Sequence, residues 1–144
     1  MLRLSHRVAE QVQRLAKESY PYECGGFLAG KASSDKEAME VYPMRNENDL
    51  QPKVRFEINP KDFKKVENDA TRKGLELLVF FHSHPDHPAL PSAFDAERAA
   101  GLAPFWPGLS YLIVSVEKAA RFELSSWVFV EANNGFEKED IVIV

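Results

Sequence analysis

The segment Leu77-Leu78-Val79-Phe80-Phe81-His82-Ser83-His84 joins five consecutive apolar residues to two histidines that flank a serine. A continuous apolar run is typical of a central strand that is covered on both faces. Because side chains alternate along a strand, His82 and His84 project to the same side. The segment therefore predicts a buried strand that ends in two imidazoles, which can share one metal ion.

A proline-rich loop and a short helix follow this strand. Ser92 begins the helix, and Asp95 lies in its first turn. Two histidines and one carboxylate leave a fourth tetrahedral position open, as in catalytic zinc sites. A structural zinc site is closed by four protein ligands that usually include cysteine, and Cys24 is the only cysteine. The residue types therefore predict a catalytic metal centre formed by His82, His84 and Asp95.

Hydrolysis at such a centre also needs a general base. A bound zinc ion lowers the pKa of its water to about 7, and a nearby carboxylate can take the proton and hand it to the leaving amine. Near the histidines only Asp86, in the loop, offers a carboxylate, so spacing alone leaves the base open. Ser92 and Asp95 also match a helix capping box. We expect Ser92 to cap the helix and contact substrate, and Asp95 to act as a ligand rather than a cap.

The remaining elements suggest an α/β protein. We expect helices over residues 5–17, 60–74 and 92–100, strands over 24–30, 40–44, 54–58, 77–84, 111–116, 122–130 and 141–144, and a polar turn over 31–37. Ser5 and Asn59 are good N-caps, and Pro60 suits the first helical position. The small residues of 24–30 suit a strand where backbones approach closely. Interspersed helices and strands indicate a mixed sheet with helices packed on it.

The composition is that of an ordinary globular protein. The chain has 144 residues, of which 44% are apolar and 28% charged, enough for one hydrophobic core. A net charge of −4 without a basic stripe argues against a nucleic-acid partner. No stretch approaches the ~20 apolar residues that span a bilayer, and the N-terminal residues lack the apolar core of a signal peptide. We therefore expect one domain over residues 1–144, no membrane partner and a cytoplasmic location, which a single cysteine also fits.

The metal-binding pattern resembles a known family. His-Ser-His, seven residues, Ser, two residues and Asp match the metal motif of the JAMM (MPN+, Mov34/PAD-1) metallopeptidases without a gap or substitution. The stretch from Pro21 to Gly30 resembles the family's N-terminal segment, and the likeness extends to Tyr111–Ser115. By this resemblance Glu23 is the catalytic base and Ser92 is the hydroxyl that stabilises the oxyanion. The zinc ligands that it implies are His82, His84 and Asp95.

The resemblance also implies a fold. Members have the MPN fold, which is cytidine deaminase-like and consists of a curved mixed β-sheet flanked by helices. In that fold residues 24–30 and 75–84 are neighbouring strands that bring Glu23 to the metal. We therefore expect a single JAMM/MPN+ domain.

The implied function is that of a zinc-dependent metallopeptidase, with one Zn²⁺ per chain, that hydrolyses an amide or isopeptide bond. The segment from Asp95 to Tyr111 is short, which leaves little room for the insertions of ubiquitin-cleaving members. The chain therefore resembles the compact prokaryotic members, which act after the Gly-Gly tail of ubiquitin-like sulfur-carrier proteins. We expect such a carrier as substrate and partner. The sequence does not choose between cleavage of a protein tail and release of a single amino acid, and the same ligands accept iron, cobalt or manganese.

Several alternatives stay open beside this interpretation. A non-catalytic MPN scaffold that binds partners is the main one, although such relatives lack part of the ligand set. The deaminase pattern is absent because His84 replaces its glutamate and one cysteine cannot form C-x-x-C. We expect Cys24 to be a buried core thiol rather than a nucleophile. His87 is a spare ligand, a substrate contact or a loop residue without a role. The apolar segment Ile141–Val144 suits an edge strand in a homodimer.

Overall fold

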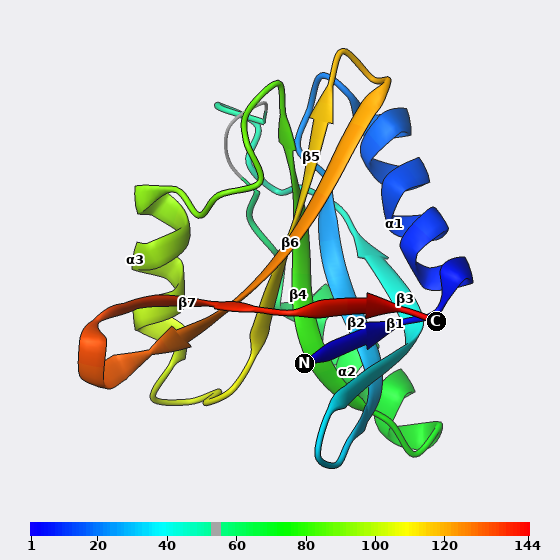
Figure 1. The fold of residues 1–144 in the computed structure, drawn as a ribbon, viewed down its shortest axis with the longest axis vertical. Coiled ribbons are helices and arrows are strands. Elements are labelled where there is room, and N and C mark those ends of the chain that lie inside the picture. The colour runs from blue at the N-terminus through cyan, green and yellow to red at the C-terminus, as the bar shows by residue number, and fades with distance from the viewer. Residues whose placement is uncertain (53–55) are drawn as a thin grey trace.

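A curved, eight-stranded mixed sheet with helices on both faces forms the architecture of the computed structural model, which describes residues 1–52 and 56–144 (Figure 1). The strand order is β7-β6-β5-β4-β2-β3-β1-β8. The strands are β1 (Leu2–Leu4), β2 (Gly25–Ala32), β3 (Lys36–Met44), β4 (Glu76–Pro85), β5 (Ser110–Glu117), β6 (Arg121–Val130), β7 (Gly135–Glu139) and β8 (Ile141–Ile143). The helices are α1 (His6–Ser19), α2 (Pro60–Arg72), α3 (Ala93–Leu102) and the short 3-10 helix η1 (Glu131–Asn133). The predicted α/β fold with a curved mixed sheet is confirmed.

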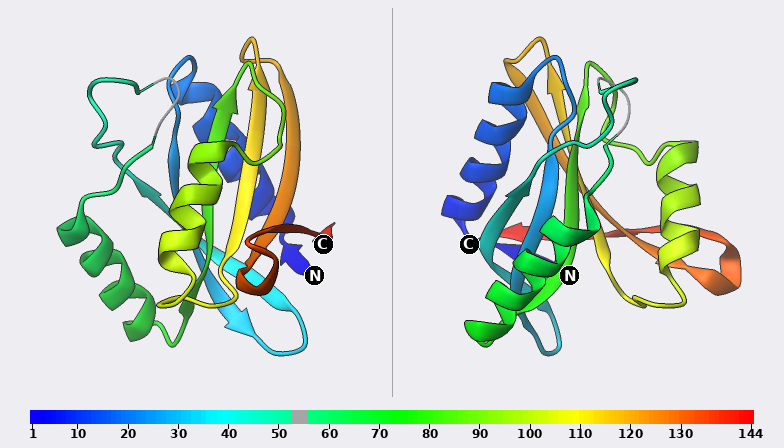
Figure 2. Two further views of the ribbon diagram at one scale, coloured as in Figure 1. Left: turned by 90° about the vertical axis from the view of Figure 1, so that its left-hand side faces the viewer. Right: turned by 180° about the vertical axis from the view of Figure 1, so that it is seen from behind.

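The helices cover two separate apolar clusters, one on each face of the sheet (Figure 2). On one face α1 buries Val8 and Val12 against residues such as Phe81. On the other face α2 and α3 pack over a cluster that includes Phe27 and Phe80. Phe80 and Phe81 therefore face opposite layers, as expected of a strand covered on both sides.

The predicted helix starts are also confirmed. Ser5 Oγ accepts a hydrogen bond from Val8 N at 3.1 Å, and Asn59 Oδ1 accepts one from Lys61 N at 2.8 Å. Each bond satisfies a backbone donor that has no partner inside its helix. None of the described helices is long and apolar enough to cross a membrane.

The sheet curves so strongly that the C-terminal segment pairs with the strands at both of its ends. β7 pairs with β6, whereas β8, which begins two residues after β7 ends, pairs in parallel with β1 at the opposite end of the strand order. Figure 1 shows β7 crossing in front of the sheet toward the N-terminal strand. The C-terminal segment predicted as an edge strand thus lies at one end of the sheet as β8.

Glycines let β2 lie close to its neighbour. A Cβ atom on Gly26 would lie 2.2 Å from the Tyr42 carbonyl oxygen, and one on Gly30 would lie 1.8 Å from the Glu37 carbonyl oxygen. No larger residue fits at either position without a backbone shift, so the close approach predicted from the small residues is confirmed.

Some predicted elements were wrong. Of the strand predicted over residues 54–58, residues 54 and 55 lie outside the described residues, and Phe56–Ile58 form no strand. Phe56 is instead 1% exposed, with its ring against Gly25 and Phe80, because its side chain fills the core just before α2 begins. The turn predicted over 31–37 is shorter, since β2 reaches Ala32 and β3 begins at Lys36. The short strands β1 and β7 were not predicted.

Candidate metal centre

The last residues of β4 carry the two histidines. His82 and His84 are 1% and 7% exposed, and they lie on the same face of the strand as Phe80. Ser83 points to the opposite face. The predicted pair of imidazoles at the end of a central strand is therefore present and buried.

Three ligand atoms converge at this point. The His82 Nε2 and His84 Nε2 atoms lie 3.0 Å apart. Asp95 Oδ1 lies 3.0 Å from His82 Nε2, and Asp95 Oδ2 lies 3.2 Å from His84 Nε2. The group can hold a metal ion, since its potential ligand atoms all lie within 4.8 Å of one another. Two nitrogens and one carboxylate match the donors that zinc takes in catalytic sites.

The Asp95 carboxylate also closes the capping box of α3. Asp95 Oδ2 accepts a hydrogen bond from Ser92 N at 2.8 Å, and Ser92 Oγ accepts one from Asp95 N at 3.1 Å. The expectation that Asp95 would not act as a cap was wrong. A carboxylate has several lone pairs, so the cap fixes Asp95 while both of its oxygens still reach the histidines.

Burial and the contacts within the cluster shift the pKa values of these three groups. Burial lowers the pKa of His82, although contact with Asp95 opposes that shift. Burial also acts to lower the pKa of His84, but the Asp95 carboxylate and the Pro88 carbonyl raise it above its ordinary value. Although burial acts to raise it, the pKa of Asp95 lies well below its usual range because of the two histidine contacts. The cluster thus offers an ionised carboxylate and a neutral His82, the forms that bind metals.

The second ring nitrogens of the two histidines differ. His84 Nδ1 lies 3.0 Å from the Pro88 carbonyl oxygen, which only accepts a hydrogen bond, so this nitrogen carries the proton. His84 Nε2 then faces the cluster, the orientation that the ligating nitrogen of a metal-bound histidine takes. His82 Nδ1 is buried and has no hydrogen-bond partner among residues 1–52 and 56–144.

Strand pairing brings Glu23 to the same place. β2 runs antiparallel to β4 with Gly25 opposite His82. Cys24 N donates a hydrogen bond to Ser83 Oγ at 2.8 Å, and Ser83 N donates to the Cys24 carbonyl at 2.9 Å. These bonds place Glu23, which is 8% exposed, beside His84. The predicted pairing of residues 24–30 with the histidine strand is confirmed, and Cys24 is a buried thiol as expected.

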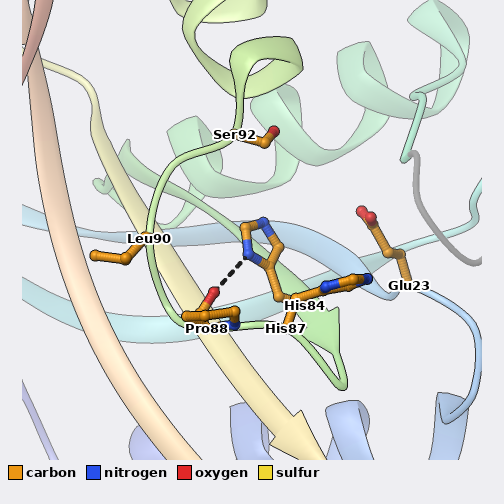
Figure 3. Close-up of a pocket in the computed structure, with 6 residues that line it drawn as sticks. All are labelled: Glu23, His84, His87, Pro88, Leu90 and Ser92. Atoms are coloured by element: carbon orange, nitrogen blue, oxygen red, sulfur yellow. Dashed lines mark hydrogen bonds between the residues drawn. The ribbon is translucent and has the colours of Figure 1, made fainter.

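A cavity of about 310 Å³ opens beside this cluster (Figure 3). Its lining residues are Glu23, His84, His87, Pro88, Leu90 and Ser92. In Figure 3 the His87 ring extends toward Glu23, while the His84 ring is held by the Pro88 carbonyl. His87 lines the cavity but does not belong to the group of ligand atoms that the described residues form. The Ser92 hydroxyl accepts its capping bond and keeps its own hydrogen to donate.

Asp86, the only carboxylate near the histidines in sequence, forms hydrogen bonds outside the metal-binding cluster. Its Oδ2 accepts a hydrogen bond from the Tyr20 hydroxyl, and its Oδ1 accepts one from Lys118 N at 2.8 Å. The Tyr20 bond is the main reason that the pKa of Asp86 is lowered. Asp86 therefore anchors the loop after β4, and Glu23 is the carboxylate beside the cluster.

Two serines that the sequence did not single out hold this loop in place. Ser115 Oγ donates to the His87 carbonyl at 2.6 Å, and Ser125 Oγ donates to the Ala89 carbonyl. Trp127 Nε1 donates to Ser125 Oγ at 2.8 Å. Small polar residues inside otherwise apolar strands are a visible signal, but the sequence does not say which backbone groups they reach.

Arg98 was also missed. It lies three residues after Asp95 on α3, a spacing that places both on one helix face. Its Nη2 donates a hydrogen bond to the Phe56 carbonyl. The guanidinium carbon lies 4.9 Å from the ring centroid of Phe80 and 4.9 Å from that of Phe94. A partly buried cation thus lies beside the metal-binding face of the sheet.

Several known proteins are similar to this chain in sequence and in fold. The family described as prokaryotic homologs of the JAB domain matches residues 5–130. A desampylase of Haloferax volcanii is 34% identical over 66% of this chain and 63% of its own length. A probable TtuB-protein conjugate cleaving protease of Thermus thermophilus is 34% identical over 59% of this chain and 54% of its own length. A solution structure of a Desulfitobacterium hafniense protein superposes with a TM-score of 0.85 and 30% identity, over 100% of this chain and 93% of that one. The matches thus span about half to two thirds of the two relatives.

Proposed function

This chain belongs to the family of prokaryotic homologs of the JAB domain, and from that premise we propose that it is a zinc-dependent metallopeptidase that hydrolyses an amide or isopeptide bond. One observation carries the proposal. Two imidazole nitrogens and a carboxylate converge within 4.8 Å next to a cavity that Glu23 also lines. Ligands that leave a position open, together with a carboxylate base, are what metal-assisted hydrolysis requires.

The proposed zinc ligands are His82, His84 and Asp95, one ion per chain. The ion would supply Lewis acidity and would lower the pKa of water to about 7. Two of the proposed ligands are already held in place by the chain. The Pro88 carbonyl sets the tautomer of His84, and the capping box orients Asp95. Such support reduces the reorganisation that binding would otherwise cost.

Glu23 is the proposed general base. It takes a proton from water and later delivers it to the leaving amine. Glu23 is buried and lies beside His84. Asp86, the other nearby carboxylate, instead accepts a hydrogen bond from Tyr20. Ser92 is the proposed oxyanion donor, because its hydroxyl faces the same cavity and keeps its hydrogen. One preorganised donor of this kind lowers the activation barrier by about 3–4 kcal/mol.

The proposed substrate is a ubiquitin-like, sulfur-carrier-type protein whose Gly-Gly tail carries an adduct. Two relatives are named as a desampylase and as a protease that cleaves conjugates of the protein TtuB. The open cavity is small, and a Gly-Gly tail has no side chains to accommodate near the metal.

We also propose that residues 1–144 form one JAMM/MPN+ domain in the cytoplasm. The sheet supports the single domain, because its strands include both Leu2–Leu4 and Ile141–Ile143. The buried, unpaired Cys24 fits a reducing compartment. A homodimer is supported by the apolar β8 at one end of the sheet.

The experiment is hydrolysis of a carrier that bears a Gly-Gly–lysine isopeptide bond, followed by mass spectrometry with the zinc-loaded protein. We expect cleavage after the second glycine. Glu23→Gln should bind zinc normally but lose activity by about 100-fold or more, the range for removal of a general base. Glu10→Gln, an exposed change on α1, is the matched control. Full turnover by the Glu23→Gln protein would refute the assignment of the base.

A further inference from the structure

The His82 ring lacks the usual support of a metal ligand. Metal-binding histidines almost always donate their second N–H to a carboxylate, a carbonyl or water, and this bond fixes the ring. His84 follows the rule through Pro88. His82 does not, because its buried Nδ1 meets no hydrogen-bond partner in the described part of the chain. Beyond the Asp95 contact at Nε2, a contact with the face of the ring therefore orients it.

The ring of Phe80 provides that contact. Phe80 and His82 lie two residues apart on one face of β4, and their rings stack with centroids 5.4 Å apart and an interplanar angle of 17°. Arg98 in turn places its guanidinium carbon 4.9 Å from the Phe80 centroid, within the ~6 Å range of cation–π attraction. A guanidinium, a phenyl ring and an imidazole thus form a continuous series of contacts.

Arg98 is itself firmly placed. Its Nη2 donates to the Phe56 carbonyl, and the Phe94 ring lies 4.9 Å from its guanidinium carbon. Burial lowers the pKa of Arg98, while the charges of Asp95 and Glu23 oppose this shift. The two carboxylates therefore offset a cation near the metal centre. α3 thus supplies both Asp95, which contacts His82 Nε2 directly, and Arg98, which reaches the same imidazole through Phe80.

We propose that Arg98 is a positioning residue for the metal centre, which acts through the Phe80 ring to hold the His82 imidazole with Nε2 toward the other ligands. The inference rests on the proposed metal function and extends it to a residue that contacts neither metal nor substrate. It predicts that loss of the guanidinium weakens zinc binding even though every ligand remains.

Zinc affinity, measured by competition with a chromophoric chelator, tests the proposal without relying on catalysis. We expect Arg98→Met to weaken zinc binding about 10-fold, as loss of a ligand-orienting contact typically does. Arg98→Lys, which keeps the charge on a flexible stem, should lose less. Arg72→Met, at a side chain that is 77% exposed on α2, is the matched control and should bind zinc like the wild type. The visible spectrum of the Co²⁺-substituted protein should change in Arg98→Met and stay unchanged in the control.

A double-mutant cycle tests the route. In a Phe80→Leu background the Arg98→Met change should have little further effect on zinc affinity, since the ring that relays it is absent. Wild-type affinity and an unaltered Co²⁺ spectrum in a folded Arg98→Met protein would overturn the proposal, as would a full 10-fold loss in the Phe80→Leu background. If Arg98→Met does not fold, Arg98→Lys decides by the same criteria. A wild-type chain that binds no zinc would instead overturn the metal assignment itself.

Discussion

Two clusters of polar side chains lie in the same sheet, one buried and one partly buried, and they differ in the groups that meet the carboxylate. At the end of β4, the nitrogens of His82 and His84 converge on a carboxylate within 4.8 Å. Beside β7, Glu139 Oε1 accepts hydrogen bonds from the hydroxyls of Ser110 and Ser126 at 2.6 and 2.8 Å. The ammonium of Lys36 lies 3.9 Å from the other oxygen of Glu139.

The difference shows which cluster needs a ligand. The Glu139 cluster contains its own donors and its own cation, so its partly buried charge is compensated within the chain. In the histidine cluster the Nδ1–H of His84 points to the Pro88 carbonyl, and the Nε2 atoms of both histidines face the Asp95 carboxylate. A metal ion can bind to all three of these groups at once. A cluster whose imidazole nitrogens and carboxylate converge on one point therefore indicates a metal site, whereas one that pairs its carboxylate with hydroxyls and an ammonium indicates a structural role.

Removal of one ligand should have the largest effect. His84→Ala should reduce zinc affinity by more than about 100-fold, beyond what loss of a supporting contact costs, and should reduce hydrolysis to background. Elemental analysis of the purified variant and the isopeptide assay measure both. A His84→Ala protein that retains zinc and activity would remove the distinction between the two clusters.

The matching change in the other cluster should affect stability alone. Glu139→Ala leaves the hydroxyls of Ser110 and Ser126 without their acceptor, which costs about 1–3 kcal/mol. Denaturation with urea should show this loss in the free energy of unfolding, while zinc stoichiometry stays that of the wild type. Loss of zinc at unchanged stability would show that the Glu139 cluster is not merely structural.

Ser92 links the two kinds of role, because it caps α3 and faces the cavity. Ser92→Ala should lower kcat by about 100-fold through loss of the oxyanion donor and should cost ~1 kcal/mol of stability through loss of the cap. Ser92→Thr keeps both groups and serves as the control. Steady-state kinetics and thermal unfolding separate the two effects, and an unchanged kcat in Ser92→Ala would limit Ser92 to capping.

Tyr111, on β5 between the two clusters, should have the smallest effect and only at high pH. Burial is the main cause that raises its pKa to about 12. Between its unfolded value near 10 and that value the unfolded chain binds fewer protons than the folded one, so stability falls as pH rises. The loss should approach ~2 kcal/mol by about pH 11.5. Tyr111→Phe should reduce the slope of stability against pH in this window, and an identical slope in both proteins would contradict the assignment.

The sequence predicted the histidine cluster better than its surroundings. The alternation along β4 predicts that His82 and His84 share a face, and the Ser-x-x-Asp spacing predicts a helix start that carries Asp95. Both follow from local periodicity. The dual role of Asp95 was missed because a sequence does not show that one carboxylate can satisfy a cap and two imidazoles.

Contacts between distant segments could not be predicted. The Glu139 cluster joins residues of β3, β5, β6 and β7. No sequence pattern near Glu139 predicts that Ser110, 29 residues away, is its partner. The strand expected at 54–58 failed because Phe56 looks like a strand residue, although its ring fills the core beside Phe80. Such outcomes depend on tertiary packing, which overrides local propensity.

The most direct test of the central claim is the zinc content of the purified chain after zinc is supplied and excess metal is removed. We expect one zinc per chain in the wild-type, Glu23→Gln and Glu139→Ala proteins and none in His84→Ala. A wild-type chain that stays metal-free under these conditions would contradict the account, because the converging ligand atoms of His82, His84 and Asp95 would then bind no ion.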